Sequence, residues 1–267
     1  MIKRITLLTI GLLCVFVGTA KAQFFIEEGK VVLAVSGGER VSKTLTIHNT
    51  TTESLDLKAY WEDFQYQAPY DGAKLFLAAG TATGSASQWI SYAPQEFTIP
   101  AFGQKKLEYM VTVPPKIEGG HYGVLFFEKA GDPVRDATGV KIVSRVGCLF
   151  FIEAKDKKKI ASLQDIKISS SIVSGTFENK GNVVSIPQIT YYIMDDQGVA
   201  VDRGEIKKLY LPPEAIAPWE IPLISGLTAG HYTMVINADL EDGDVVVKEV
   251  DFVKDAKGTL TIGNVRD

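Results

Sequence analysis

Residues that could perform acid–base or metal chemistry are sparse in this sequence. Three histidines occur in 267 residues, and two of them, His121 and His231, lie 110 positions apart in the same tripeptide, Gly-His-Tyr. A general base or a metal ligand needs an acid, a thiol or another ligand close by. Neither histidine has such a group at ligand spacing, and the sequence contains no phosphate loop, nucleophile elbow or zinc-helix motif. The sequence therefore predicts a protein that is not an enzyme and that has no cofactor or metal site.

The remaining candidates for chemistry have simpler structural explanations. Cys148 lies in the apolar run RVGCLFFI, where a lone cysteine usually behaves as a small buried hydrophobe. Acidic residues cluster from Glu241 to Asp244, but their spacing does not fit a calcium loop. Asp242-Gly243 lies between two strand-like runs, as expected of a two-residue hairpin turn. We interpret these acids as turn residues.

The first 22 residues have the layout of a secretory signal peptide. Lys3 and Arg4 precede an apolar run from Ile5 to Val17, and an A-x-A cleavage site ends at Ala22. The run is shorter than the roughly 20 residues of a membrane-spanning helix, and no comparable run follows it. We predict export to the periplasm, with the cell surface as the alternative, and no membrane span in the mature chain.

Charge balance and cysteine count narrow the choice of partners and of stabilising interactions. Cleavage removes three basic residues and no acid, which leaves 25 Lys and Arg against 32 Asp and Glu, a net charge of −7. An acidic chain with no basic cluster larger than Lys157-Lys158-Lys159 argues against a nucleic-acid partner. Cys14 leaves with the leader, so Cys148 has no partner for an intramolecular disulfide. Core burial must hold the fold together.

Short runs of alternating apolar and polar residues, separated by turn residues, dominate the chain after the leader. This pattern predicts half-buried antiparallel strands. The residues expected to face inward are Leu45 and Ile47 in the first run, Leu55, Leu57, Ala59 and Trp61 in the second, and Leu107, Tyr109, Val111 and Val113 in the third. We predict an all-β protein of two immunoglobulin-like β-sandwich domains in tandem.

The two Gly-His-Tyr tripeptides mark an internal repeat. Each half has a strand that ends at an asparagine (Asn49, Asn179), an aromatic-rich strand, a proline-bearing turn and then the tripeptide. In immunoglobulin-like sandwiches a tyrosine at this place can bond its hydroxyl to upstream backbone, an arrangement called the tyrosine corner. We predict that Tyr122 and Tyr232 form such corners with buried rings, and that the preceding histidines point outward.

The repeat also sets the predicted domain boundaries. We expect a signal peptide at 1–22, a first sandwich at 23–153, a second at 160–253 and a polar tail at 254–267 that frays. The segment from Glu153 to Lys159, EAKDKKK, has the composition of a solvated connector. The first half is longer because of a Gly/Ala/Ser-rich insertion between Phe64 and Trp89, predicted to be a loop or a small hairpin.

The longest strand-like run of the first half, TGVKIVSRVGCLFFIEA, closes that half. A long apolar strand at a sheet edge pairs with other chains unless something covers it. This run either packs in the core or offers its edge to a partner by strand addition. Length and β-branched content leave both interpretations open.

The layout resembles that of the PapD-like periplasmic pilus-assembly chaperones. The similarity runs through Lys30 to Leu33, the strand end at Thr46 to Asn49, the stretch from Trp89 to Pro100, and Leu149-Phe150-Phe151. The resemblance implies a non-enzymatic chaperone with two immunoglobulin-like domains set at an angle. Such proteins lend the last strand of the first domain to the open groove of a pilus subunit. Two basic residues in the interdomain cleft hold the subunit's C-terminal carboxylate.

The implied basic pair is only partly matched. Lys30 occupies the first basic position, and Cys148 stands at the place of the second. The nearest base is Arg145, three positions earlier, which puts it on the opposite strand face unless Gly147 forms a bulge.

The leading hypothesis is a periplasmic chaperone that binds a fimbrial or secreted subunit by strand addition along Val140 to Ile152, with an usher as a further candidate partner. The alternative is a structural or adhesive module of an exported surface assembly, with its partner surface in the insertion between Phe64 and Trp89. The sequence gives no indication of oligomeric state. The expected partner-binding residues are Lys30, Val140, Ile142, Ser144, Arg145 and Val146, and the expected structural residues are Trp61, Tyr122 and Tyr232.

Overall fold

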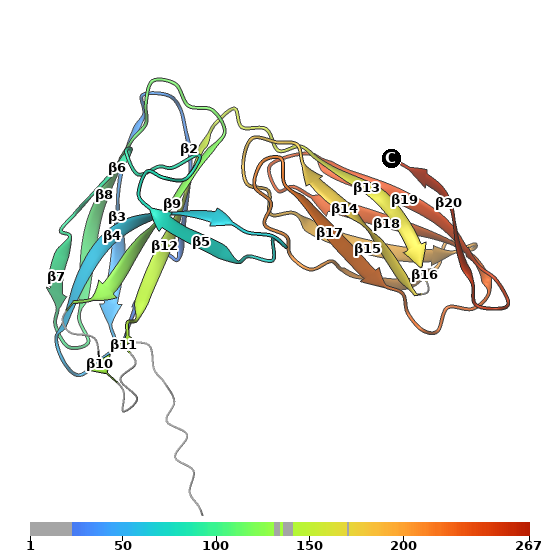
Figure 1. Ribbon diagram of the computed structural model, residues 1–267, viewed down its shortest axis with the longest axis horizontal. Helices are drawn as coiled ribbons and strands as arrows, with labels where there is room; N and C mark the ends of the chain where they lie inside the picture. Colours follow the sequence, from blue (N-terminus) through green and yellow to red (C-terminus); the bar gives the residue numbers. More distant parts are fainter. Residues whose placement is uncertain (1–22, 131–133, 136–140, 170) are drawn as a thin grey trace, which may run out of the picture.

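The computed structural model describes residues 23–130, 134–135, 141–169 and 171–267. The predicted leader lies outside them, so the signal peptide stays a prediction. The described chain consists of strands and connecting loops arranged as two β-sandwich bodies (Figure 1). The predicted all-β, two-domain fold is confirmed.

The first domain packs a four-stranded sheet against a six-stranded sheet. All strand pairs in it are antiparallel except β2 with β12. The four-stranded sheet has the order β1 (Phe24–Ile26), β3 (Arg40–Asn49), β8 (Gln104–Thr112), β6 (Ile90–Ala93). The six-stranded sheet has the order β2 (Lys30–Val35), β12 (Arg145–Ala154), β9 (Gly120–Lys129), β4 (Leu55–Tyr66), β5 (Lys74–Ala78), and β7 (Glu96–Ile99) also pairs with β4. A separate hairpin is formed by β10 (Val134–Arg135) and β11 (Lys141–Ile142).

The second domain packs a three-stranded sheet against a five-stranded one. The first has the order β13 (Ala161–Ser169), β14 (Ile172–Asn179), β17 (Ile216–Pro222). The second has the order β16 (Ala200–Glu205), β15 (Gln188–Asp195), β18 (Gly230–Asp239), β19 (Val245–Lys254), β20 (Leu260–Arg266).

The end of the chain corrects the prediction of a fraying polar tail. Residues 260–266 form β20, which pairs with β19. Leu260 and Ile262 pack against the second-domain core, and the Arg266 guanidinium binds the carboxylates of Glu249 and Asp251. Alternate apolar residues and one arginine are enough to hold a strand whose composition is otherwise polar.

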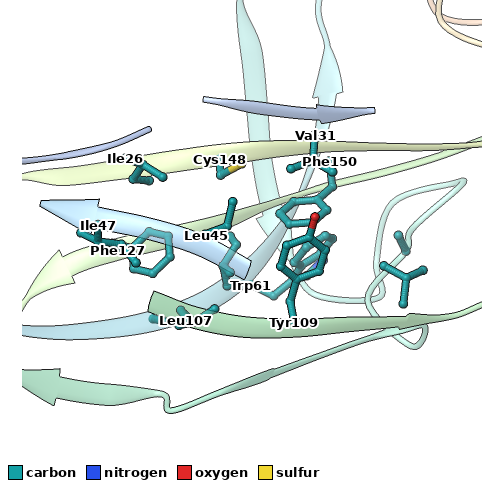
Figure 2. Close-up of a cluster of buried hydrophobic side chains, with 14 of the residues drawn as sticks. Ile26, Val31, Leu45, Ile47, Trp61, Leu107, Tyr109, Phe127, Cys148 and Phe150 are labelled. Carbon is teal, nitrogen blue, oxygen red and sulfur yellow. The ribbon is translucent and has the colours of Figure 1, made fainter. Parts of the chain in front are cut away.

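The first-domain core lies between its two sheets (Figure 2). The predicted inward-facing residues of β3, β4 and β8 are all buried, which confirms the alternation seen in the sequence. Trp61 contributes its ring to this core, with its centroid 5.3 Å from that of Phe150. A β-carbon added to Gly123 would lie 2.0 Å from Trp61 Cζ2, so only glycine leaves room for the indole on the neighbouring strand.

Hydrogen bonds of two asparagines confirm the internal repeat. Asn49 ends β3, and its Nδ2 donates to the carbonyls of Glu53, Ile99 and Pro100. Asn179 ends β14, and its Nδ2 donates to the carbonyls of Val183 and Leu211. In both domains the amide therefore ties the turn four residues downstream to the proline-bearing turn. The acceptor residues differ between the domains, but they occupy equivalent positions in the repeat.

The tyrosine-corner prediction is right for one copy and wrong for the other. Tyr232 Oη donates to the carbonyl of Thr228, four residues upstream, at 3.0 Å. Tyr122 Oη instead accepts a hydrogen bond from the backbone N–H of Val184 in the second domain, at 2.7 Å. Because both faces of β9 are buried, strand parity alone did not show that Tyr122 faces away from the inter-sheet core.

The same reversal corrects the prediction that His121 points outward. Its ring packs on Trp89, with centroids 4.0 Å apart, at the margin of the inter-sheet core. Burial lowers the pKa of His121, more than its backbone hydrogen bonds raise it. His231 in the second domain is exposed, as predicted.

Candidate functional site: the domain junction and the free edge of β12

Strand β12 is a central strand along one half and an edge strand along the other. From Leu149 to Glu153 it pairs with β9 on one side and with β2 on the other. From Arg145 to Cys148 it pairs with β9 alone. Within the predicted partner-binding segment, Val140 to Ile152, the described residues of β12 that have a strand neighbour on one side only are Arg145–Cys148.

The backbone N–H and C=O groups of Arg145 and Gly147 lie in the plane of the sheet and point away from β9. The N–H of Leu149 donates to the carbonyl of Gly29, which precedes β2, at 3.0 Å. Peptide groups alternate in direction along a strand, so those of Gly147 and Arg145 face the same side, beyond the end of β2. Residues before Glu27 run in β1, which pairs with β3 in the opposite sheet. Because of this change of sheet, no described strand pairs with β12 on that side from Arg145 to Cys148.

The other predicted contact residues do not form one group. Val140 lies outside the described residues, and Ile142 belongs to β11, where it pairs with Val134 rather than extending β12. Ser144 is exposed in the connection between β11 and β12. Val146 is partly buried and packs against the inter-sheet core.

Lys30 and Arg145 are on the same sheet face but do not form one site. Lys30 pairs with Leu149, four residues along β12 from Arg145, a separation of about 13 Å at 3.3 Å per residue. The Arg145 guanidinium is already bound, at 2.9 Å to a carboxylate oxygen of Glu62 and 3.9 Å above the ring of Phe126. The two cations therefore have different neighbours, Phe151 for Lys30 and Glu62 with Phe126 for Arg145.

The ammonium group of Lys30 is the available cation of the pair. Its Nζ lies 4.3 Å from the ring centroid of Phe151, and no carboxylate in the described chain lies within ion-pair distance of it. It lines a cavity of about 210 Å³ at the domain junction. The other lining residues are Val32, Phe151, Glu153, Lys157, Lys159, Val184, Ile186, Glu241 and Asp242.

Ion pairs across this cavity join the connector to the second domain. Lys157 Nζ lies 2.8 Å from Glu153 and 2.6 Å from Asp242, and Lys159 also contacts Asp242. Burial alone would raise the pKa of Asp242, but hydrogen bonds from the two ammonium groups outweigh it and hold that pKa at about 2. Lys157 and Lys159 are thus paired with three carboxylates, those of Glu153, Glu241 and Asp242, and Lys30 is the lining cation with no ion pair to a described residue.

Sequence reasoning missed this cluster. The segment EAKDKKK was interpreted as a solvated connector, yet the side chains of Lys157 and Lys159 are only 13% and 9% exposed. Asp242 was assigned to a two-residue turn, but β18 and β19 pair from Asp239 to Val245, which leaves five residues between them. The longer loop is what carries Asp242 to the lysines. Alternating Lys and acid residues near a boundary were the signal available.

Tyr122 joins the two domains at the centre of the junction. Its ring packs in an apolar cluster on the outer face of the six-stranded sheet. The cluster also contains Phe64 and Phe151 of the first domain and Val184 of the second domain. The hydroxyl accepts the Val184 N–H within this buried cluster.

Replacing Tyr122 by phenylalanine is expected to lower the free energy of unfolding by about 1–2 kcal/mol, since the buried Val184 N–H loses its acceptor while the ring contacts stay. Guanidinium denaturation measures the change. The Tyr232→Phe variant is the comparison: it removes a part-buried hydroxyl within one domain, so the Val184 amide should exchange faster only in the Tyr122 variant. Unchanged exchange of that amide would contradict the assignment.

The junction presents backbone groups and charged side chains. Burial raises the pKa of Cys148 to about 12, so its thiol stays protonated near neutral pH. Within the described ranges, no cluster of three or more His, Cys, Asp or Glu residues could hold a metal ion. The same part of the chain contains no helix that is long and apolar enough to cross a membrane.

Comparisons place this architecture among known folds. No protein-family model matches the sequence, and neither does any curated protein. A chain of a chaperone–tip adhesin complex of CFA/I fimbriae matches at 14% identity with a TM-score of 0.50, over 85% of this chain and 97% of the other. The class 5 fimbriae chaperone CfaA matches at 15% identity and TM-score 0.49, over 84% and 97%. A chain of the Salmonella enterica SafA pilin–SafB chaperone complex matches at 12% identity and TM-score 0.45, over 88% and 98%. At these identities, what the first match shows is the fold: this chain has the two-domain, all-β fold of the PapD-like fimbrial chaperones.

Proposed function

We propose that this protein is a periplasmic chaperone-like protein that binds an exported subunit, such as a fimbrial subunit, by strand addition at Arg145–Cys148. The observation that carries the proposal is the uncovered edge, where two peptide units face outward beyond the end of β2. An incoming strand would take their hydrogen bonds and extend the six-stranded sheet. Main-chain pairing of this kind supplies affinity with little dependence on the partner's sequence.

A contrast with another edge of the chain supports this choice. Strand β17 is an edge of the three-stranded sheet, and it carries Pro218 and Pro222 opposite Thr176 and Ile172 of β14. A proline within a paired strand sits where its missing N–H would point away from the neighbour. The outer edge of β17 therefore lacks two N–H donors, and this makes pairing with another strand less favourable. The free segment of β12 contains no proline.

Lys30 adds a charge-based contact to the proposal. Its unpaired ammonium lies beside the cleft at the point where β2 begins, next to the free segment of β12. A strand added at that segment would bring its end toward Lys30, and a terminal carboxylate there would gain a charge-assisted hydrogen bond. Arg145 contributes its backbone rather than its side chain.

The sharpest test is an Arg145→Pro variant compared with Arg145→Ala. Arg145 is the first strand residue, where proline is tolerated, and its N–H faces the free edge, so proline removes a donor there without breaking the β9 ladder. Alanine removes the same side chain and keeps the N–H. The probe is a co-encoded exported subunit, co-expressed in the periplasm and recovered with the tagged protein.

We expect Arg145→Pro to lower the recovered complex by about tenfold or more, a loss of about 1.4 kcal/mol. Arg145→Ala should lower it by less than about threefold. Equal recovery with both variants and the unchanged protein would show that this edge does not bind the subunit. Acidic replacement of Val146 is a weaker test, because that side chain packs against the core and its loss would also affect folding.

A further inference from the structure

The insertion of the first domain reaches across to the second domain. It forms a hairpin of β4 and β5 joined by residues 67–73, whereas the equivalent connection between β15 and β16 spans only residues 196–199. Figure 1 shows the tip of the β4–β5 hairpin extending toward the second sandwich. The carbonyl of Tyr70, in the tip, accepts a hydrogen bond from the backbone N–H of Tyr210 at 2.8 Å.

The Tyr210 ring lies against the hairpin on two sides. It stacks on Tyr66, with centroids 5.1 Å apart and an angle of 30° between the rings. Lys74 Nζ lies 4.9 Å from the Tyr66 centroid and 5.9 Å from that of Tyr210, and it also donates to the carbonyl of Gly72 at 3.1 Å. A β-carbon added to Gly72 would lie 3.0 Å from Tyr210 Cε2, so the ring touches the hairpin backbone itself.

These contacts are distant from the other attachments of the second domain. The sheet order places β12, β9, β4 and β5 side by side. The lysine–aspartate cluster holds the second domain at the β12 side, the Tyr122 hydroxyl holds it at β9, and Tyr210 holds it at β4 and β5. Three steps between strands correspond to about 14 Å. Attachments spread over that width resist rotation about any one of them.

We propose that the β4–β5 hairpin is a strut that, through Tyr210, fixes the orientation of the second domain relative to the first. Domains move relative to one another by default unless their interface is both large and hydrophobic. Without the strut, the remaining attachments lie at β12 and β9, close to the connector, and the second domain can swing about them. The inference goes beyond the proposed function and does not depend on any partner. The tip of the insertion, residues 67–73, is then occupied by the chain's own second domain.

Interdomain distances measured by double electron–electron resonance test the strut. Nitroxide labels are attached to Ser42→Cys in β3 and Thr261→Cys in β20, both exposed positions, in the full chain with Cys14 replaced by serine. Cys148 is fully buried and stays unlabelled. One variant is Tyr210→Ala. The other replaces residues 67–73 by Asn-Gly, a two-residue turn that preserves the pairing of Tyr66 with Lys74.

We expect both variants to broaden the distance distribution about twofold, as for domains without a large apolar interface. The matched control is Tyr192→Ala, which removes a 42% exposed tyrosine on β15 of the same domain and should leave the width unchanged. An unchanged width in the loop replacement, which leaves the second domain's sequence intact, would overturn the proposal. So would equal broadening in the Tyr192 control.

Discussion

Replacing Asn179 by alanine is expected to lower the free energy of unfolding of the second domain by about 3 kcal/mol. Its side chain is 1% exposed and makes three hydrogen bonds with backbone, to the carbonyls of Val183 and Leu211 and from the N–H of Gly181. Alanine fills none of these roles. It leaves the Val183 carbonyl and the Gly181 N–H without partners, and the Leu211 carbonyl keeps only the N–H of Ser185. Each unsatisfied buried group costs about 1–3 kcal/mol, and water can reach only the part-buried Gly181 N–H.

Hydrogen exchange measured by mass spectrometry resolves the two domains and so tests this prediction. Protection of β14 and β18 should fall in Asn179→Ala while β3 and β9 stay protected, and Asn49→Ala should give the reverse pattern. The matched control is Asn237→Ala, a half-buried asparagine of β18 that makes no side-chain hydrogen bond within the described chain. If the amides of β14 and β18 exchange no faster in Asn179→Ala than in Asn237→Ala, the Asn179 side chain does not stabilise its domain as proposed.

The sequence correctly predicted the core residues of strands that have one buried face and one solvent-exposed face. In β3, β4 and β8 the apolar residues alternate with polar ones, so residues such as Leu45, Trp61 and Tyr109 could be assigned to the core without knowing which strands pair. The repeated asparagine and proline turns were equally local signals. They depend on hydrogen bonds that close within a single domain, and they recur because both sandwiches have the same connection to tie.

The sequence was a poor guide wherever a strand is buried on both faces. β9 reads GHYGVLFFEK, and six consecutive residues of it are buried. Leu125 and Phe127 face the inter-sheet core, while Tyr122, Val124 and Phe126 face the junction with the second domain. No alternation distinguishes the two faces, and the second domain that covers one of them comes later in the chain. The partner of the Tyr122 hydroxyl could not be found from local pattern.

The sequence indicated that the first domain has a free strand edge, but not which residues form it. The run that closes the first half contains a free edge, but which residues are free depends on where β2 begins and on the passage of the chain from β1 into the opposite sheet. Those are facts about residues over a hundred positions upstream. For the same reason the lysines at 157 and 159 could not be assigned to Asp242, because the β18–β19 loop that carries it is placed by the whole second sandwich.

Asp63 is the buried acid whose loss we expect to affect the first domain most. Its side chain is fully buried. One carboxyl oxygen accepts the backbone N–H groups of Thr81 and Ala82 at 2.9 and 3.0 Å. The other accepts Ser85 Oγ at 2.8 Å and the Trp61 indole N–H at 3.3 Å. A single side chain therefore anchors the loop after β5 to the inter-sheet core, and that loop in turn lies along β9 beside Tyr122.

Asp63→Ala should lower the free energy of unfolding by about 3 kcal/mol, since the Ala82 N–H and the Trp61 indole N–H lose the acceptor they have. Thr81 and Ser85 lose one of two partners each, and they keep the Ala78 carbonyl and Ser87 Oγ. Asp63→Asn should be nearly as damaging, because its amide nitrogen would face donors. Guanidinium denaturation measures both, and Asp56→Ala, an exposed acid on the same strand β4, should cost less than about 0.5 kcal/mol. The sharper readout is local: the amides of Thr81 and Ala82 should exchange faster in the Asp63 variants. If these amides stay protected, the hydrogen bonds within the loop hold it in place, and the Asp63 carboxylate does not stabilise it.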